Sequence, residues 1–399
     1  MRSNGSSPHP AAVHAARRIQ HPLLDPPAAS ALQVASLEDA VGALLETRHD
    51  VVLFPAEAAL PLEALARGLG GPGIAALNVA SMPFGAAFGR WLERTGSRVV
   101  ELRPPPDRAV DPEEIARALR ANPDVSVVTL VHAEAATGVR HDLLAIASLV
   151  RQHGAVFLLD VVASLGAHEV ALDAWDVDCA VIGPQKALAG PSGVSLAVVS
   201  PRGWDAMVGN GAAPRDSILS LLDWREQWID AGRTAVRGTP PPLEILALEA
   251  ALERIVAEGL PGVRRRHEAA AAASRAGAAA LGLAPFAPDA EAAFVATTLR
   301  APAATDARQL VEMASARGRV ALSAGYGSLA TGVLRLDHTG QRARLPVVVD
   351  ALVALGRALD ERRALDGSIP EAVEAAKAAW RSCLAQHVPT IGRRQTQRR

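Results

Sequence analysis

The chain has 399 residues, and 41 Lys and Arg side chains nearly balance 42 Asp and Glu side chains, giving a formal net charge of −1. This balance argues against a nucleic-acid binding protein, which carries a basic surplus. There is no apolar run of the roughly 18 residues that cross a bilayer. The two cysteines, Cys179 and Cys383, show neither a disulfide framework nor a metal-ligand spacing. We therefore expect a cytoplasmic protein with no nucleic-acid partner, no membrane contact and no metal.

Short apolar runs alternate with helical patterns between residues 51 and 200, which is typical of repeated βα units. The runs are apolar throughout, as expected when helices cover both faces of a parallel sheet. A helix-start signal, Asp111-Pro112-Glu113-Glu114, opens a helical pattern that ends near Ala121. Together these patterns predict an α/β fold with a large, doubly wound, mostly parallel sheet. Its strands are expected at Asp50–Phe54, Ile74–Val79, Val99–Leu102, Ser126–His132, Ala155–Asp160, Cys179–Ile182 and Ser195–Ser200.

Two long helical patterns, Leu243–Glu258 and Val263–Leu281, follow the βα region. Beyond them the pattern predicts a smaller α+β unit. Its strands are expected at Ala293–Leu299 and Val333–Leu336, and its helices at Asp306–Arg317 and Pro346–Arg362. We therefore divide the chain into an irregular segment (1–30), a large domain (31–258), a small C-terminal domain (259–366) and a C-terminal helix and tail (367–399).

Lysine is nearly absent, because two of the 41 basic residues are lysines and the rest are arginines. Unlike arginine, lysine can lose its proton, attack a carbonyl and form a Schiff base. Lys377 lies in a polar-faced helical pattern, but Lys186 follows a predicted strand, and Asp160 ends another. Ligands of doubly wound sheets bind beyond the carboxyl ends of the strands, so these two side chains could share one site. Pyridoxal chemistry uses such a pair: the lysine holds the aldehyde, and the carboxylate keeps the pyridine nitrogen protonated.

The surrounding segments resemble the class V aminotransferases of the fold type I pyridoxal-phosphate enzymes, a group that includes alanine-glyoxylate and serine-pyruvate transaminases. A further stretch, Ala213–Ser220 followed by Asp223, Trp224 and Trp228, resembles one branch, the pyridoxamine-pyruvate transaminases. That branch uses unphosphorylated vitamin B6 as a substrate. The family resemblance rests on Asp160–Gly166, Gly183–Gly193, His132–Gly138, Gly259–His267 and Gly332–Arg335.

The resemblance implies a role for several residues. Lys186 would be the Schiff-base lysine that carries the proton of the 1,3-shift, Asp160 would pair with the ring nitrogen, and Gln185 would lie beside the ring. Arg335 would clamp the carboxylate of the amino or oxo acid, although an arginine in a strand is also commonly a surface ion-pair partner. Phe84 falls where the branch places an aromatic ring that stacks on the pyridine, and its alternative role is that of a core residue at the start of an amphipathic helix.

The loop that holds the cofactor phosphate in this family differs here. The family uses small residues at a helix N-terminus, whereas the loop Phe54–Pro61 lacks Gly, Ser and Thr and contains Glu57, as the pyridoxamine-pyruvate branch does. A like charge about 4 Å away costs about 4 kcal/mol at an effective dielectric near 20, and a phosphate dianion roughly doubles this cost. The sequence leaves open whether the cofactor is pyridoxal phosphate or unphosphorylated pyridoxal or pyridoxamine.

Other departures concern contacts to cofactor and substrate. Ala135 stands where the family has a Ser or Thr that touches the cofactor, and Val236 stands where phosphate-using members have a Tyr from the neighbouring subunit. Thr239 still precedes a proline, as the family pattern requires. Tyr326 falls where the pyridoxamine-pyruvate branch has a second arginine, which leaves the substrate specificity open.

The resemblance implies a homodimeric or homotetrameric transaminase that acts on a small amino acid and a 2-oxo acid. We favour the pyridoxamine-pyruvate reaction, in which pyridoxal and L-alanine give pyridoxamine and pyruvate. One alternative is a pyridoxal-phosphate-dependent transaminase of the alanine-glyoxylate or serine-pyruvate type. A second is a weakly active or inactive B6-binding paralogue, which the departures at Ala135, Val236 and Tyr326 motivate. Cysteine desulfurase chemistry is disfavoured, because Cys383 lies in a C-terminal helical pattern rather than in a mobile loop.

Overall fold

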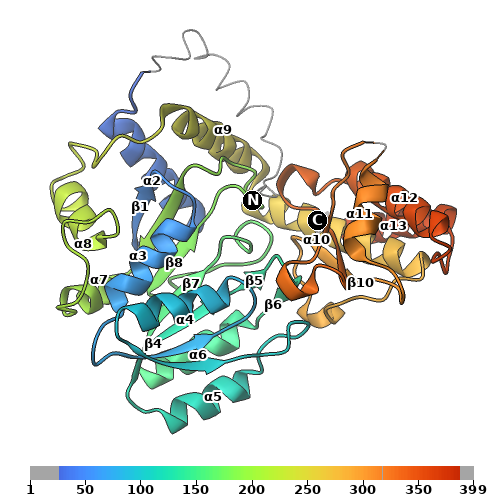
Figure 1. Cartoon of the computed structure of the whole chain (residues 1–399). Coiled ribbons are helices and arrows are strands. Elements are labelled where there is room, and N and C mark those ends of the chain that lie inside the picture. The colour runs from blue at the N-terminus through green and yellow to red at the C-terminus, as the bar shows by residue number, and fades with distance from the viewer. Residues whose placement is uncertain (1–26, 317, 387–399) are drawn as a thin grey trace, which may run out of the picture.

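The computed structural model describes residues 27–316 and 318–386. It has two lobes: a large lobe, formed by the described residues before helix α10, and a small lobe, formed by α10 and the described residues after it (Figure 1). The sheet of the large lobe has the strand order β1-β9-β8-β7-β4-β2-β3. Strand β9 is antiparallel to both of its neighbours, and the other strands run in one direction. The predicted α/β class with a mostly parallel sheet is confirmed.

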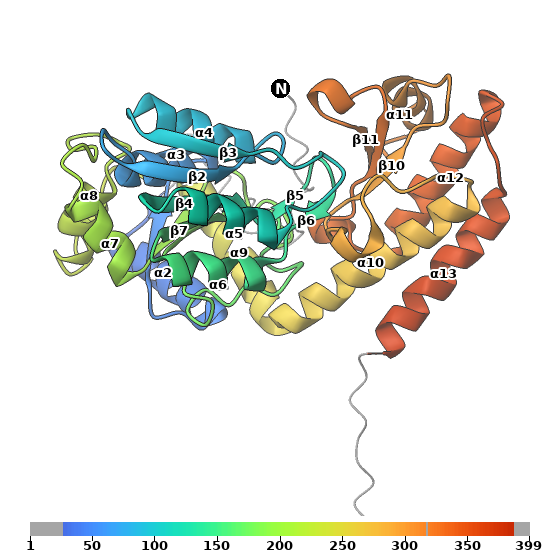
Figure 2. The same cartoon turned by 90° about the horizontal axis from the view of Figure 1, so that it is seen from below.

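The predicted strands of this sheet agree with the observed ones to within one residue at each end. The central strands are buried along their whole length, because helices pack on both faces of the sheet (Figure 2). A short hairpin of β5 (Ala133–Glu134) and β6 (Val139–Arg140) was not predicted. The large sheet contains β1 (Asp50–Phe54), β2 (Ala75–Val79), β3 (Arg98–Leu102), β4 (Val125–Val131), β7 (Val156–Asp160), β8 (Cys179–Ile182) and β9 (Ser195–Val199).

Helix α5 (Pro112–Ala121) shows how local signals start a helix. The Asp111 side chain accepts a hydrogen bond from the Glu113 backbone N–H, a proline occupies the first turn, and Glu113 and Glu114 lie at the positive end of the helix dipole. The other helices of this lobe are α2 (Ala31–Leu45), α3 (Ala59–Leu69), α4 (Gly85–Arg94), α6 (Leu143–His153), α7 (Pro201–Val208), α8 (Leu221–Trp224) with a π-helical turn (Arg225–Ile229), and α9 (Pro242–Glu258).

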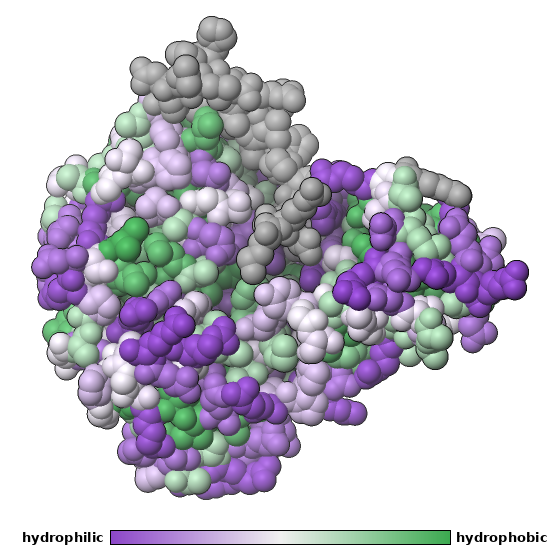
Figure 3. Space-filling view, in the orientation of Figure 1, coloured by the Kyte–Doolittle hydropathy of each residue, from purple (hydrophilic) through white to green (hydrophobic). Residues whose placement is uncertain are grey.

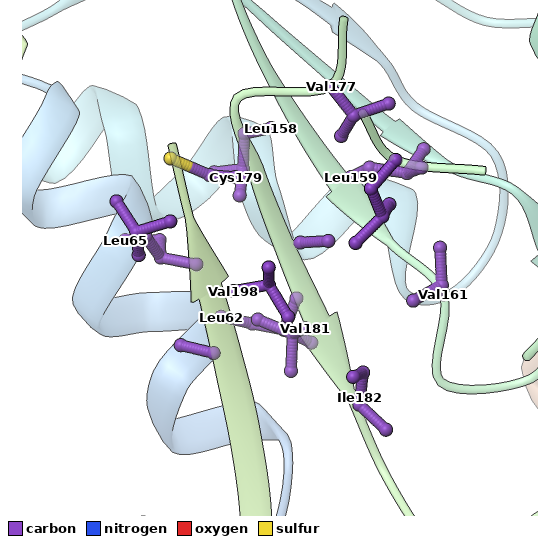
Figure 4. Close-up of a cluster of buried hydrophobic side chains, with 14 of the residues drawn as sticks. Leu62, Leu65, Leu158, Leu159, Val161, Val177, Cys179, Val181, Ile182 and Val198 are labelled. Carbon is purple, nitrogen blue, oxygen red and sulfur yellow. The ribbon is translucent and has the colours of Figure 1, made fainter. Parts of the chain in front are cut away.

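The packing of α3 on the sheet shows at which edge of the sheet the N-terminus of this helix lies. Figure 4 shows Leu62, from the first turns of α3, beside Val181 and Val198, whereas Leu65, one turn later, lies toward Cys179 at the start of β8. The helix therefore runs antiparallel to β8. Its N-terminus lies at the carboxyl edge of the sheet, which is the edge where ligands bind in this type of fold.

The small lobe contains a three-stranded antiparallel sheet of order β10-β12-β11, with β10 (Thr297–Arg300), β11 (Leu322–Ala324) and β12 (Val333–Leu336). The predicted start of β10 at residue 293 is wrong by four residues. The reason is that Ala293 donates its N–H to Gly138 of the β5–β6 hairpin, 2.8 Å away, instead of pairing within the small sheet. Strand β11 was not predicted. The helices of this lobe are α10 (Leu260–Ala280), α11 (Ala307–Ser315), α12 (Leu345–Glu361) and α13 (Ile369–Ala385).

The two largest hydrophobic cores of the described residues correspond to the two lobes, and α10 contributes to both. Val263, in its first turn, belongs to the core of the large lobe, whereas Ala270 and Ala273 belong to the core of the small lobe. The domain boundary that we predicted at residue 259 lies between α9 and α10, and it stays a prediction. Most of the predicted N-terminal segment (1–26) and the predicted tail beyond residue 386 lie outside the described residues.

The surface of the protein carries both apolar and hydrophilic side chains. In the view of Figure 3, apolar side chains form patches on the large lobe, and hydrophilic side chains cover much of the small lobe. Among the described residues, no helix has both the length and the apolar character needed to span a membrane.

Gly340 joins the small lobe to the carboxyl edge of the large sheet. Its backbone N–H donates to Nε2 of His267 at 2.9 Å, and its φ is +61°, a left-handed conformation that favours glycine. A Cβ atom at this position would lie 2.7 Å from the backbone oxygen of Lys186. The contact brings the backbone after β12 directly against the turn that carries Lys186.

We expect Gly340→Ala to destabilise the protein by more than the backbone conformation alone would cost, because the new methyl group would push against the Lys186 carbonyl. Gly327→Ala is the matched control, since Gly327 also has a left-handed φ, +57°, but its Cβ would meet no atom within 4 Å. The control substitution should cost about 1 kcal/mol of unfolding free energy. Urea unfolding of both variants checks the difference, and equal losses would contradict the close contact.

Candidate active site

Asp160 is the last residue of β7 and is 4 % exposed. Its Oδ1 accepts a hydrogen bond from the backbone N–H of Val162 at 2.8 Å. Burial raises the pKa of Asp160 to about 6, while the Val162 hydrogen bond and the charge of Lys186 act in the opposite direction. A buried carboxylate of this kind is stabilised in its ionised form by a positive partner at the carboxyl edge of the sheet.

Lys186 lies in the turn that follows β8. Burial lowers the pKa of its amine, and the positive charge of Arg335 lowers it further, whereas the carboxylates of Asp337, Asp160 and Glu57 raise it. The structure therefore brings together side chains from β7, from the loop before α3, from β12 and from the residue after β12. A lowered pKa increases the fraction of neutral, nucleophilic amine at a given pH.

Glu57 lies just before α3. Its Oε2 accepts a hydrogen bond from the backbone N–H of Ala59 at 2.8 Å, and its Oε1 accepts one from Nε2 of Gln185 at 3.0 Å. The carboxylate thus occupies the start of the helix, where unpaired N–H groups and the helix dipole favour a negative charge. Glu57 and Gln185, predicted separately, are direct hydrogen-bond partners.

Glu134, in strand β5, was not among the predicted site residues. It is fully buried, and its Oε1 accepts hydrogen bonds from the backbone N–H of Gly85 at 3.1 Å and from the Ser81 hydroxyl at 3.3 Å. Burial raises its pKa well above the ordinary range, and the nearby charge of Asp160 acts in the same direction. The glutamate holds the start of α4, and therefore Phe84, close to Asp160. A glutamate inside the apolar His132–Gly138 segment was the available signal.

Phe84 immediately precedes α4, and 49 % of its surface is exposed. The alternative interpretation of Phe84 as a core residue is therefore wrong. Its stacking on a cofactor ring stays a prediction.

Arg335 lies in β12, the central strand of the small sheet, and its Nη2 donates to Oδ1 of Asp337 at 2.7 Å. Both side chains are largely buried, with 12 % and 7 % exposure respectively. Arg335 is therefore an ion-pair partner, as the alternative interpretation held, but not on the surface. Asp337 was not predicted as a site residue.

The remaining predicted residues are more scattered. Ala135 is buried against other small side chains near Lys186, including Ala163 and Ala187. Thr239 lies in an exposed irregular segment before α9, and Tyr326 is 50 % exposed after β11. No hydrogen bond joins Thr239 or Tyr326 to Lys186 within the described part of the chain. Residues 27–316 and 318–386 contain no group of three or more His, Cys, Asp and Glu side chains that could hold a metal.

Comparison with known proteins decides the family. The family description "Aminotransferase class-V" matches residues 33–333. The chain belongs to the class V aminotransferases. Members of this family are pyridoxal-phosphate-dependent transferases, so the predicted family and enzyme class are confirmed.

Individual relatives of this class V aminotransferase agree with that assignment. A pyridoxamine-pyruvate transaminase from Mesorhizobium japonicum is 36 % identical over 310 residues, which cover 77 % of this chain and 78 % of the relative. A serine-glyoxylate aminotransferase from Methylorubrum extorquens is 31 % identical over 78 % of this chain and 79 % of the relative. The crystal structure of a pyridoxamine-pyruvate aminotransferase from Mesorhizobium loti superposes with a TM-score of 0.87 at 31 % identity, covering 95 % of this chain and 96 % of that one.

We expect pyridoxal to react with Lys186 in strong preference to Lys377, by about tenfold or more, because burial lowers the pKa of the Lys186 amine. Lys377 is exposed on α13 and ion-paired with Glu374, at 2.8 Å. Since the chain has two lysines, borohydride trapping and peptide mass mapping assign the label without ambiguity. Lys186→Ala should abolish the label and Lys377→Ala should preserve it; predominant labelling of Lys377 would contradict the assignment.

Proposed function

We propose that this class V aminotransferase transfers an amino group between an amino acid and unphosphorylated vitamin B6, converting pyridoxal and L-alanine into pyridoxamine and pyruvate. The observation that carries the proposal is the position of Glu57, whose carboxylate binds the first free N–H group of α3 and the Gln185 amide. The similarity to the pyridoxamine-pyruvate transaminase from Mesorhizobium japonicum supports it.

The donor set suits the ring of a B6 vitamer. Asp160 would hold a proton on the ring nitrogen, and the resulting positive charge would favour the ionised form of the buried carboxylate, whose pKa is raised to about 6, chiefly by burial. Gln185, which donates to Glu57, would lie beside the ring. When bound, the vitamin supplies an electron sink that stabilises negative charge at the α-carbon of the donor.

The part of the site that would face the phosphate of pyridoxal phosphate suits that group less well. The helix start that would bind a phosphate already has a carboxylate on the Ala59 N–H, and a phosphate dianion beside Glu57 would meet like-charge repulsion. A hydroxymethyl group, as in pyridoxal, carries no charge and can donate to the same carboxylate. Glu57 therefore supports the unphosphorylated form.

Lys186 and Arg335 would act on the amino acid. The lowered pKa of Lys186 makes Nζ available as a base that takes the proton from the α-carbon of the donor. Nζ would then return the same proton to complete the 1,3-shift. Arg335 would orient the donor carboxylate through its guanidinium group. Phe84, exposed at the start of α4, would cover the ring, whereas Ala135 leaves room beside it without supplying a hydroxyl group.

We extend the proposal to self-association as a homodimer or homotetramer. Exposed apolar side chains, Met82 and Phe84, lie next to the backbone that binds Glu134, and a second subunit would remove them from water. Both cysteines are free thiols, which is typical of the reducing cytoplasm, where we place the enzyme.

A second candidate function is that of a pyridoxal-phosphate-dependent transaminase of the serine-glyoxylate type. The similarity to the Methylorubrum extorquens enzyme favours it. In that case, the purified protein would retain pyridoxal phosphate, and Glu57 would not affect the affinity of the protein for pyridoxal phosphate.

We expect Glu57→Ser to increase the affinity for pyridoxal phosphate by at least about tenfold and to reduce the preference for pyridoxal, because it removes the like charge and supplies a phosphate donor. Absorbance titration of the protein with each vitamer gives both dissociation constants. Glu63→Ser is the control, since Glu63 lies in the first turns of α3, six residues after Glu57, but pairs with Arg67. An unchanged ratio of the two constants in Glu57→Ser would refute the role of Glu57.

A further inference from the structure

The predicted carboxylate-binding arginine already has a carboxylate of its own. Nη2 of Arg335 donates to Oδ1 of Asp337 at 2.7 Å, and Oδ2 of Asp337 accepts a hydrogen bond from the Ser323 hydroxyl at 2.6 Å. Side chains two residues apart lie on the same side of a strand, so the backbone of β12 and its continuation hold the two groups together. The small lobe therefore presents a neutral ion pair rather than a free cation.

This pair faces the site and not the solvent. Both side chains are largely buried, and both act on the Lys186 amine, whose pKa Arg335 lowers and Asp337 raises. Nε of Arg335 is buried and makes no hydrogen bond to any described residue. Nη2 therefore binds Asp337, while the buried Nε donor is left without a partner among the described residues.

Acidic side chains outnumber basic ones around Lys186. Among the side chains that act on its amine, Arg335 is positive, whereas Asp337, Asp160 and Glu57 are acidic. Tyr326, which follows β11 in the same lobe, adds no positive charge at neutral pH. A substrate carboxylate would therefore share the positive charge of Arg335 with Asp337.

We propose that Asp337 determines donor specificity by competing with the substrate carboxylate for Arg335. When no substrate carboxylate is present, Asp337 compensates the buried positive charge of Arg335, so that the site also accepts primary amines that lack an α-carboxylate. When a monocarboxylate donor binds, the guanidinium group is shared, and affinity is moderate. Among the described side chains that act on the Lys186 amine, a second carboxylate on the donor would find no further cation, which disfavours aspartate and glutamate. This inference rests on the proposed role of Arg335 in transamination.

The test compares Asp337→Asn and Asp337→Ser with the wild-type enzyme, using two readouts. The first is the dissociation constant of propionate, a carboxylate that cannot react, measured by calorimetry. The second is kcat/KM for L-alanine relative to 1-aminopropane, with pyridoxal as the acceptor. We expect both variants to bind propionate about tenfold more tightly and to shift the donor ratio toward L-alanine by a similar factor, because a charged hydrogen bond no longer competes.

Asp306→Asn is the matched control. Asp306 and Arg308 form another ion pair two residues apart in the small lobe, at 2.7 Å, but it is far more exposed, and its removal should leave both readouts unchanged. Weaker propionate binding in both Asp337 variants would overturn the inference, since it would mean that Asp337 only positions Arg335. Failure of the proposed function is distinguishable, because the wild-type enzyme would then show no amino transfer to pyridoxal while propionate binding still responded to Asp337.

Discussion

The buried amine of Lys186 is the point on which the rest of the site depends. Burial lowers the pKa of this amine, the positive charge of Arg335 lowers it further, and three carboxylates raise it. These charged groups come from three separate parts of the chain: the end of β7, the loop before α3, and β12 with the residue that follows it. A lysine with a lowered pKa therefore requires the whole fold, including the docking of the small lobe through Gly340.

At both ends of the site, a charged side chain is stabilised by a neighbouring group of the protein. At one end, Glu57 is stabilised by the start of α3 and by Gln185. At the other, Arg335 is stabilised by Asp337. In the proposed function, Glu57 would face the end of the vitamin that carries the phosphate in pyridoxal phosphate, and Arg335 would face the donor carboxylate. Both contacts would then favour ligands with fewer charges, namely a vitamin without phosphate and a donor with at most one carboxylate.

Glu134 adds a third buried carboxyl group close to Asp160. Burial raises its pKa well above the ordinary range, and the nearby charge of Asp160 acts in the same direction. Its hydrogen bond with the backbone N–H of Gly85 joins the β5 hairpin to the start of α4. Burial raises the pKa of both carboxyl groups, but Asp160 also lies near Lys186, whose positive charge lowers the pKa of Asp160.

The sequence alone determined the parallel strands, because continuous apolar runs bounded by turn residues have few other interpretations. It also singled out Lys186, because a lysine is chemically distinct from arginine and the chain has two of them. Its motifs sufficed for the family, since Asp160 ends one predicted strand and Lys186 follows another. The tertiary structure alone decided the hydrogen bond between Glu57 and Gln185, the late start of β10 and the pairing of Arg335 with Asp337. Each of these contacts depends on which backbone or side-chain groups lie close together in the folded chain. Local sequence patterns carry no information about partners more than a hundred residues away, or about which of two nearby charges becomes buried.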